Sequence, residues 1–372
     1  MTIANTVKSI SENRLATYRE RLKLRTDGDC LGLYIWNKKL CGVFLPVLQL
    51  LEVSLRNAIH LGYLEHRKDV LLAEGKAEEE IAGAIDRAWF KTFFDLHKTE
   101  YAESWRQIEQ AEITLQKMNR PNDIDQIIAK LSYGFWSHLC SEAHDDANPD
   151  SLQLWPAIQD HVFLGARKST GFVTMKEIRD LLVQINHIRN RIAHHEPIWH
   201  SSQLYDLEGF VNKVINDFKK CLKVIGWINP SNLKTLTIMQ SADELAYLCR
   251  LQTIDEYRQR GNDLASAEAL DADKWANACL LADRHDGVVI SVGRSTVIKS
   301  LKDKKTFVLD VFGKWEGQLA LQLQKDEHVN FLPARKVAKN STTLLARHVK
   351  RGHTTVHADK LEAAEMPSSN QA

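Results

Sequence analysis

Hydrophobic residues in the first 230 positions recur at steps of three and four, which is the spacing of amphipathic helices. The cleanest stripe runs from Leu204 to Ile225, and a second runs from Ile178 to Ile192. Gly28 and Gly32 predict a break between the first two helices. Further helices are expected over residues 7–26, from Pro46 in a first turn to about Tyr63, over 76–87, and from Pro121 through Leu139.

The pattern changes after Asn229-Pro230-Ser231. A capping box at Ser241 opens a predicted helix that reaches about Arg258. A further helix is expected over 264–283, followed by strand-like runs at Gly287–Val292, Thr306–Phe312 and Gln318–Leu323. We therefore predict a mainly α fold, namely a helical bundle with a smaller C-terminal α+β module. The predicted parts are a helical domain at 1–230, the module at 231–353, and a disordered polar tail at 354–372.

The helix that begins near residue 175 carries the most informative segment, Arg189-Asn190-Arg191-Ile192-Ala193-His194-His195-Glu196. Thr174 and Glu177 form a predicted capping box at its start. Pro197 disfavours a helical Glu196, so the helix is expected to end there. The histidines would then lie in the last turn, where the helix dipole favours their protonated form.

These residue types suit the cleavage of RNA. Arg189 would grip phosphate through two hydrogen bonds, and His194 would transfer a proton near neutral pH. No metal is required if the ribose 2′-hydroxyl is the nucleophile. Asn190 lies four residues before His194 on the same helix face and would orient the substrate or the imidazole.

The remaining residues near the motif complete the predicted site. His195, Arg191 and Arg56 are predicted to support it or to contact RNA, as is His187, which lies one heptad before His194. Arg189, however, is about 140° around the helix from His194. Either the helix distorts before Pro197, or a second subunit completes the site.

The motif resembles the Arg-x4–6-His signature of the HEPN ribonucleases, and its context resembles the Abi-like (abortive infection) proteins. The resemblance covers about residues 10–225 and rests on the following segments: Tyr34-Ile35-Trp36-Asn37, Leu51-Glu52-Val53-Ser54-Leu55-Arg56-Asn57-Ala58, Leu131-Ser132-Tyr133-Gly134-Phe135-Trp136, and Ile188 through Trp199. It implies an all-helical HEPN-like fold, a homodimer, and metal-independent RNA cleavage in phage defence or as a toxin. A toxin would have a neutralising antitoxin, either protein or RNA.

Composition sets further limits. The chain has 372 residues, of which 44% are hydrophobic, and no apolar run approaches the ~20 residues of a membrane span. No signal peptide is expected, and the six cysteines are scattered, so the sequence predicts a cytoplasmic protein with reduced thiols. The overall charge of +1 conceals an asymmetry, because residues 294–351 hold 13 Lys and Arg against 5 Asp and Glu. This segment could recruit RNA, contact the acidic remainder, or form a solvated surface.

Several features have simpler explanations than a catalytic one. His194, His195 and His200 have no thiolate or carboxylate at matching spacing, so neither a metal nor another cofactor is expected. Glu52, Arg56 and His60 could reach the site, but an internal ion-pair ladder explains their spacing more simply. Trp136, Trp155 and Trp199 are expected to anchor the core or an interface. The alternative function is a non-catalytic helical module that binds RNA or protein.

Overall fold

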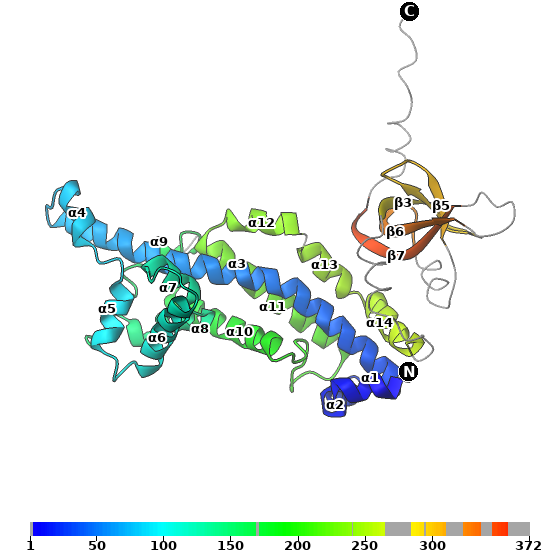
Figure 1. Ribbon diagram of the computed structural model, residues 1–372, viewed down its shortest axis with the longest axis horizontal. Helices are drawn as coiled ribbons and strands as arrows, with labels where there is room; N and C mark the ends of the chain where they lie inside the picture. Colours follow the sequence, from blue (N-terminus) through cyan, green and yellow to red (C-terminus); the bar gives the residue numbers. More distant parts are fainter. Residues whose placement is uncertain are drawn as a thin grey trace, which may run out of the picture. The chain divides into compact units, whose positions relative to one another are not determined.

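The computed structural model describes residues 3–168, 171–239, 241–264, 284–293, 295–309, 323–335 and 344–355 (Figure 1). The chain divides into two compact units. One is the helical unit, Leu40–Ser241, and the other, which we call the barrel unit, combines Met1–Lys39 with Ala242–Ala372. The N-terminal residues therefore group with the C-terminal part, whereas the sequence placed a single boundary near residue 230. The predicted fold class, mainly α with a small C-terminal α+β module, is confirmed.

Helix α3 spans Asp27–Ala73 and runs from the barrel unit into the helical unit. The other elements of the helical unit are α4 (Glu78–Ala84), α5 (Trp89–Leu96), α6 (Ala102–Lys117), α7 (Ile124–Lys130), α8 (Tyr133–Leu139), η1 (Glu142–His144), α9 (Gln159–Val162), the hairpin β1 (Arg167–Lys168) and β2 (Gly171–Phe172), α10 (Met175–Ala193), α11 (Leu207–Ile228) and α12 (Asn232–Met239). None of the described helices is long and apolar enough to cross a membrane.

The prediction that a helix begins at Pro46 is wrong, because α3 begins at Asp27 and passes through the proline. The expected break at Gly28 and Gly32 is wrong for the same reason. A proline inside a helix removes one hydrogen bond and costs about 3 kcal/mol. Phe44, Val47 and Leu48, on either side of it, are all buried, so packing holds the helix together through Pro46.

The core of the helical unit forms where α3, α8, α10 and α11 pack together. The rings of Phe44 on α3 and Phe218 on α11 meet edge to face with centroids 5.3 Å apart. The Tyr133 hydroxyl on α8 donates to the Leu182 carbonyl on α10 at 3.2 Å. All three tryptophans expected as anchors are fully buried, which confirms a core role: Trp136, Trp155 and Trp199.

The helix predicted from Pro121 to Leu139 is two helices. Asp123 caps the start of α7, and the Ser132 side chain accepts from the Phe135 amide to cap α8. Between them Leu131 is extended, with φ −70° and ψ 138°. Serine favours caps over helix interiors, and this second cap divides one hydrophobic stripe into two short helices.

The barrel unit contains the helices α1 (Ile3–Ile10), α2 (Glu12–Arg21), α13 (Ser241–Leu248) and α14 (Leu251–Asp263), and the strands β3 (His285–Ser291), β4 (Val297–Ser300), β5 (Thr306–Leu309), β6 (Glu327–Arg335) and β7 (Leu344–Thr355). The capping-box helix predicted to reach Arg258 is thus divided into α13 and α14. Strands β3 and β5 confirm two of the three predicted runs, and β4, β6 and β7 were not predicted. The expected helix at 264–283, the run at Gln318–Leu323 and the tail lie almost entirely outside the described residues.

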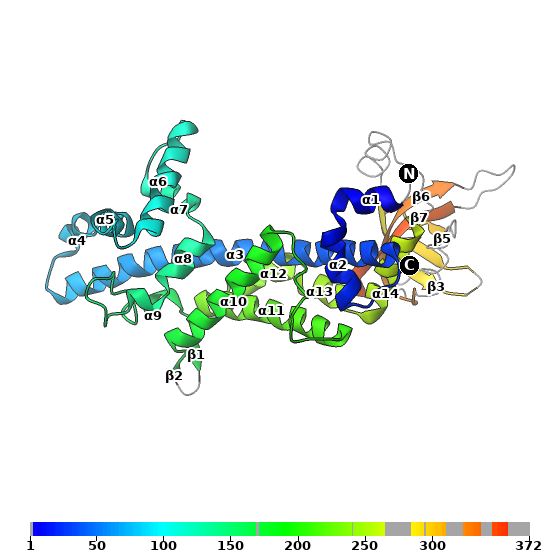
Figure 2. The same ribbon diagram turned by 90° about the horizontal axis from the view of Figure 1, so that it is seen from below.

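The five strands form a closed barrel in the order β3-β4-β5-β7-β6. Figure 2 labels β3, β5, β6 and β7 among them. Strands β5 and β7 pair in parallel, with Val308 opposite Leu345, and the other neighbours are antiparallel. The interior is filled by large apolar side chains, among them Ile298, Phe307 and Phe331. This barrel therefore has its own hydrophobic core.

Candidate functional site

Helix α10 carries the Arg-Asn-x-x-x-His motif, and its sequence explains how it is placed. The predicted capping box is confirmed, since the Thr174 hydroxyl accepts from the Glu177 amide and the Glu177 carboxylate accepts from the Thr174 amide. Ile178, Leu182 and Ile185 are fully or almost fully buried, so α10 packs one face against α8 and α11. The motif lies at the opposite end, where this buried stripe runs out.

The helix ends at Ala193, three residues before the position predicted from Pro197. His194 is the C-cap, and His195 adopts a left-handed conformation with φ +60°. The His195 amide donates to the Ile192 carbonyl at 3.1 Å, and the Glu196 amide donates to the Arg191 carbonyl at 2.8 Å. These two bonds make a Schellman motif. The helix therefore ends through its own C-terminal hydrogen bonds, upstream of Pro197.

The structure brings Arg189, Asn190 and His194 into one short segment. The Arg189 guanidinium donates through Nη1 to Oδ1 of Asn190 at 3.3 Å. The His194 amide donates to the Asn190 carbonyl at 2.9 Å. Arg189 and Asn190 are half-buried, whereas His194 and His195 are exposed. The Asn190 side chain thus contacts Arg189, whereas its bond to His194 is the ordinary backbone bond of the last helical turn.

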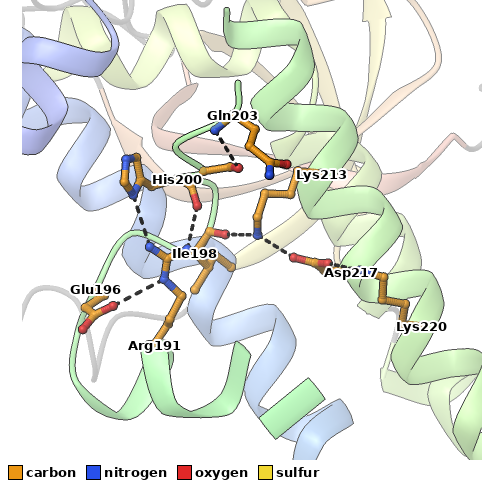
Figure 3. Close-up of polar contacts among 9 residues, drawn as sticks. Arg191, Glu196, Ile198, His200, Gln203, Lys213, Asp217 and Lys220 are labelled. Atoms are coloured by element: carbon orange, nitrogen blue, oxygen red, sulfur yellow. Dashed lines mark hydrogen bonds and ion pairs between the residues drawn. The ribbon is translucent and has the colours of Figure 1, made fainter. Parts of the chain in front are cut away.

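Arg191 has different surroundings, and it holds the segment that follows the helix (Figure 3). Its Nη1 donates to the His200 carbonyl at 2.6 Å, and its Nη2 lies 3.2 Å from Nδ1 of the same histidine. Its Nε forms an ion pair with the Glu196 carboxylate at 3.3 Å. All three groups lie in the turn beyond the helix, so this guanidinium fixes that turn to α10.

A second cation, Lys213 on α11, holds the same turn, and it was not among the residues predicted from the sequence. Lys213 Nζ donates to the Ile198 carbonyl at 2.9 Å and to Asp217 at 2.6 Å (Figure 3). Lys220 donates to the other oxygen of Asp217 at 2.8 Å. The Asp217 side chain is only 9% exposed. A carboxylate within the apolar stripe of α11, with lysines four before and three after it, was the signal in the sequence.

Two further residues predicted for the site, His187 and Arg56, have different surroundings. His187 is exposed on α10, consistent with its predicted face. Arg56 on α3 donates to the Ala129 carbonyl at 3.3 Å, so the structure does not place it with the motif. His60 accepts from the Trp89 indole at 3.2 Å, and burial lowers its pKa. Arg56 and His60 therefore bond to a carbonyl and an indole, not to each other as an ion-pair ladder would require.

Neither of two cavities in the described part of the chain is lined by the motif. One, of about 370 Å³, is lined by barrel-unit residues that include Tyr247, Tyr257 and Arg351. The other lies along α6 and includes Arg106 and Lys130. Within the described residues, no three His, Cys, Asp or Glu side chains gather as metal ligands would. The candidate site is therefore the exposed C-terminal end of a helix, and its independence of metal stays a prediction.

The motif lies within a region that known proteins share. The model of the Abi-like protein family matches residues 7–200, which is more than half of the chain and includes all of α10 and the turn to His200. No curated protein and no solved structure matches. The chain therefore belongs to the Abi-like protein family, which is named after abortive infection.

Proposed function

We propose that this protein is a metal-independent endoribonuclease of the HEPN type, acting in abortive infection or as a toxin. The observation that carries the proposal is the arrangement at the end of α10, where the Arg189 guanidinium bonds to the Asn190 side chain and the following residues His194 and His195 are exposed. Membership of the Abi-like family supports the biological role.

In the proposed reaction each side chain has a chemical task. The ribose 2′-hydroxyl loses its proton to solvent as its oxygen attacks the adjacent phosphorus, the bond from phosphorus to the 5′-oxygen breaks, and a 2′,3′-cyclic phosphate forms. Arg189 neutralises charge that develops on the non-bridging oxygens. His194 is the general acid that donates a proton to the leaving 5′-oxygen. His195 and His187 supply further donors for phosphate, and Asn190 orients Arg189.

The test compares His194→Ala with His97→Ala, a matched control because His97 is also a helix C-cap, at the end of α5. Loss of a general acid is expected to slow cleavage by about 10²–10⁴-fold in His194→Ala only. Wild-type cleavage should persist in EDTA, yield 2′,3′-cyclic phosphate ends and spare DNA. A His194→Ala variant that cleaves at the wild-type rate would refute the assignment. Binding of RNA by a wild type that never cleaves would favour the non-catalytic alternative.

We further propose that the active unit is a homodimer in which Arg189 of one chain faces His194 of the other. Helix α10 continues without a break to Ala193, so no distortion ahead of His194 turns the two side chains toward one phosphate. A two-fold axis beside α10 brings the same surface of both chains together. Mixing Arg189→Ala with His194→Ala chains restores one intact site per mixed dimer. No recovery of activity, or a fully active monomer, would contradict this arrangement.

The biological role has its own test. Expression of the wild type in the cytoplasm should halt growth and fragment cellular RNA, while the His194→Ala variant should do neither. A toxin of this kind also needs a neutralising partner, which would be a protein or RNA antitoxin. Growth arrest by both proteins alike would show that the toxicity does not come from cleavage.

A further inference from the structure

The C-terminal barrel has a strand order that is specific enough to name its architecture. Five strands close in the order β3-β4-β5-β7-β6, and the only parallel pair among them, β5 with β7, joins the third strand to the fifth. This is the strand order of the OB fold, a five-stranded Greek-key barrel. In such barrels the outer surface of the second and third strands is a common binding surface, and here those strands are β4 and β5.

The outer surface of β4 and β5 can be read from burial and register. Ile298, Phe307 and Leu309 point into the barrel core. The alternate positions therefore point outward, and they pair across the two strands as Val297 with Val308 and as Lys299 with Thr306. Val297 and Val308 are half-buried, Thr306 is exposed, and Lys299 is buried with 7% of its surface exposed. The accessible part of this surface therefore consists of the two valines and Thr306.

The turn that joins β4 to β5 makes one end of this surface strongly basic. Lys302, Lys304 and Lys305 are all exposed within four residues. The one carboxylate among them, Asp303, is itself engaged, since it lies 3.7 Å from Lys305 Nζ and 3.8 Å from the ring of His285. Lys304 has a left-handed backbone with φ +61°, so the turn is tight. Three exposed lysines, one of which is paired with Asp303, thus lie together in the turn between β4 and β5.

The charge of the whole chain sharpens this observation. The segment from 294 to 351 carries a net charge of +8, with 13 basic and 5 acidic residues. The rest of the chain holds 36 basic and 43 acidic residues, a net charge of −7. Clustered lysines and arginines that neutralise phosphates release the counterions condensed on a nucleic acid, and this release supplies a large part of the binding free energy. The helical unit offers no comparable excess, so the basic barrel is where a phosphate backbone would bind.

We propose that the outer surface of β4 and β5, with the turn Lys302–Lys305, binds the backbone of single-stranded RNA. This inference rests on the proposed function, because it names where the RNA substrate is held apart from the residues that cleave it. The lysines contact phosphates, and the surface formed by Val297, Val308 and Thr306 lies against sugars and bases. Within the described residues of β4 and β5 no aromatic ring points outward, so we expect binding that is electrostatic and tolerant of sequence.

The experiment measures binding of a fluorescent oligouridylate of about 20 nucleotides to the full chain by anisotropy, across about 50–200 mM salt. All proteins carry His194→Ala, so that the probe survives if the chain cleaves RNA. The test variant combines Lys302→Gln, Lys304→Gln and Lys305→Gln. The matched control removes the same charge from exposed lysines of the helical unit, by Lys76→Gln, Lys117→Gln and Lys130→Gln.

Each phosphate contact on single strands contributes about 0.7 to the slope of log K against log salt, so the test variant should lose about 2 from that slope. Its affinity at low salt should fall by about 10-fold or more, and the control should match the parent. Equal slopes in the test variant and control would overturn the proposal, and would favour a solvated surface or a contact with acidic protein instead. Failure of cleavage by the wild type leaves this binding result intact, so the two proposals fail separately.

Discussion

Arg189 and Arg191 are two residues apart in the motif, and the structure predicts that replacing them has opposite consequences. In Arg191→Gln, the charged hydrogen bond to the His200 carbonyl at 2.6 Å is lost, together with the ion pair to Glu196. A hydrogen bond from a charged donor contributes about 1.5–3 kcal/mol, and a half-exposed ion pair contributes at most about 1 kcal/mol. Unfolding of the helical unit should therefore become easier by about 2–3 kcal/mol.

Arg189→Gln removes much less. Its one hydrogen bond within the described part of the chain is 3.3 Å long and joins it to the neighbouring residue, so the expected cost is about 0.5 kcal/mol. Its catalytic cost should be large, because removal of one donor to a developing oxyanion slows reactions by about 10²–10³-fold. Arg189→Gln should thus leave stability nearly unchanged and slow cleavage strongly, whereas Arg191→Gln should lower stability and slow cleavage much less.

Thermal unfolding and RNA cleavage, measured on both variants, test this contrast. For a unit of about 200 residues, 1 kcal/mol corresponds to a change in Tm of about 2–4 °C. Arg191→Gln should lower Tm by about 5–10 °C while cleaving at 25 °C within about 10-fold of the wild type. Arg189→Gln should change Tm by less than about 2 °C. The opposite result, a stable but inactive Arg191→Gln, would refute the distinction between a structural and a catalytic arginine.

Three further predictions concern stability. Burial lowers the pKa of His144 from 6.5 to about 4, so between these pH values the unfolded chain binds a proton that the folded chain does not bind. The free energy of unfolding should therefore fall by about 3 kcal/mol as the pH is lowered from 6.5 to 4. Urea unfolding of His144→Phe should show a flatter pH dependence. Asp217→Ala leaves Lys213 and Lys220 without their shared carboxylate, so urea unfolding should show a free energy of unfolding lower by about 3 kcal/mol. Asp217→Asn should lower it less. In Gly261→Ala the new methyl group would overlap the Gly28 carbonyl, so calorimetry should show the barrel unit destabilised by at least about 2 kcal/mol.

The sequence predicted those parts of the fold that depend on local signals. The capping box at Thr174, the stripe of α10 and the stripe of α11 are each defined by residues within one or two helical turns, and all three are present in the structure. The extension of α3 through Pro46 was not predictable in this way, because buried neighbours from distant segments offset the local penalty. Strands β4, β6 and β7 were not predicted for two reasons. Strand β4 has only four residues, and β6 and β7 pair with register shifts that break the alternation of period two.

The candidate site shows the same division. Arg189, Asn190 and His194 could be identified from residue type and spacing alone. The contacts that hold the following turn could not, because Arg191, Lys213 and Asp217 have partners that only the packing of α10 against α11 brings near. These contacts attach the turn that carries the two exposed histidines to both α10 and α11.

The backbone of His195 adopts a conformation that glycine takes more easily than histidine. The residue after a C-cap adopts a left-handed conformation in a Schellman motif, and glycine is preferred there because a side chain costs about 1 kcal/mol. This chain has histidine at that position with φ +60°, although Arg191 and Lys213 already hold the turn from two sides. Stability alone would favour glycine. Under the proposed function, the imidazole at 195 would offset this cost by contacting phosphate beside His194. His195→Gly should then raise Tm and slow cleavage, whereas a variant that is more stable and equally active would show that the side chain has no part in the reaction.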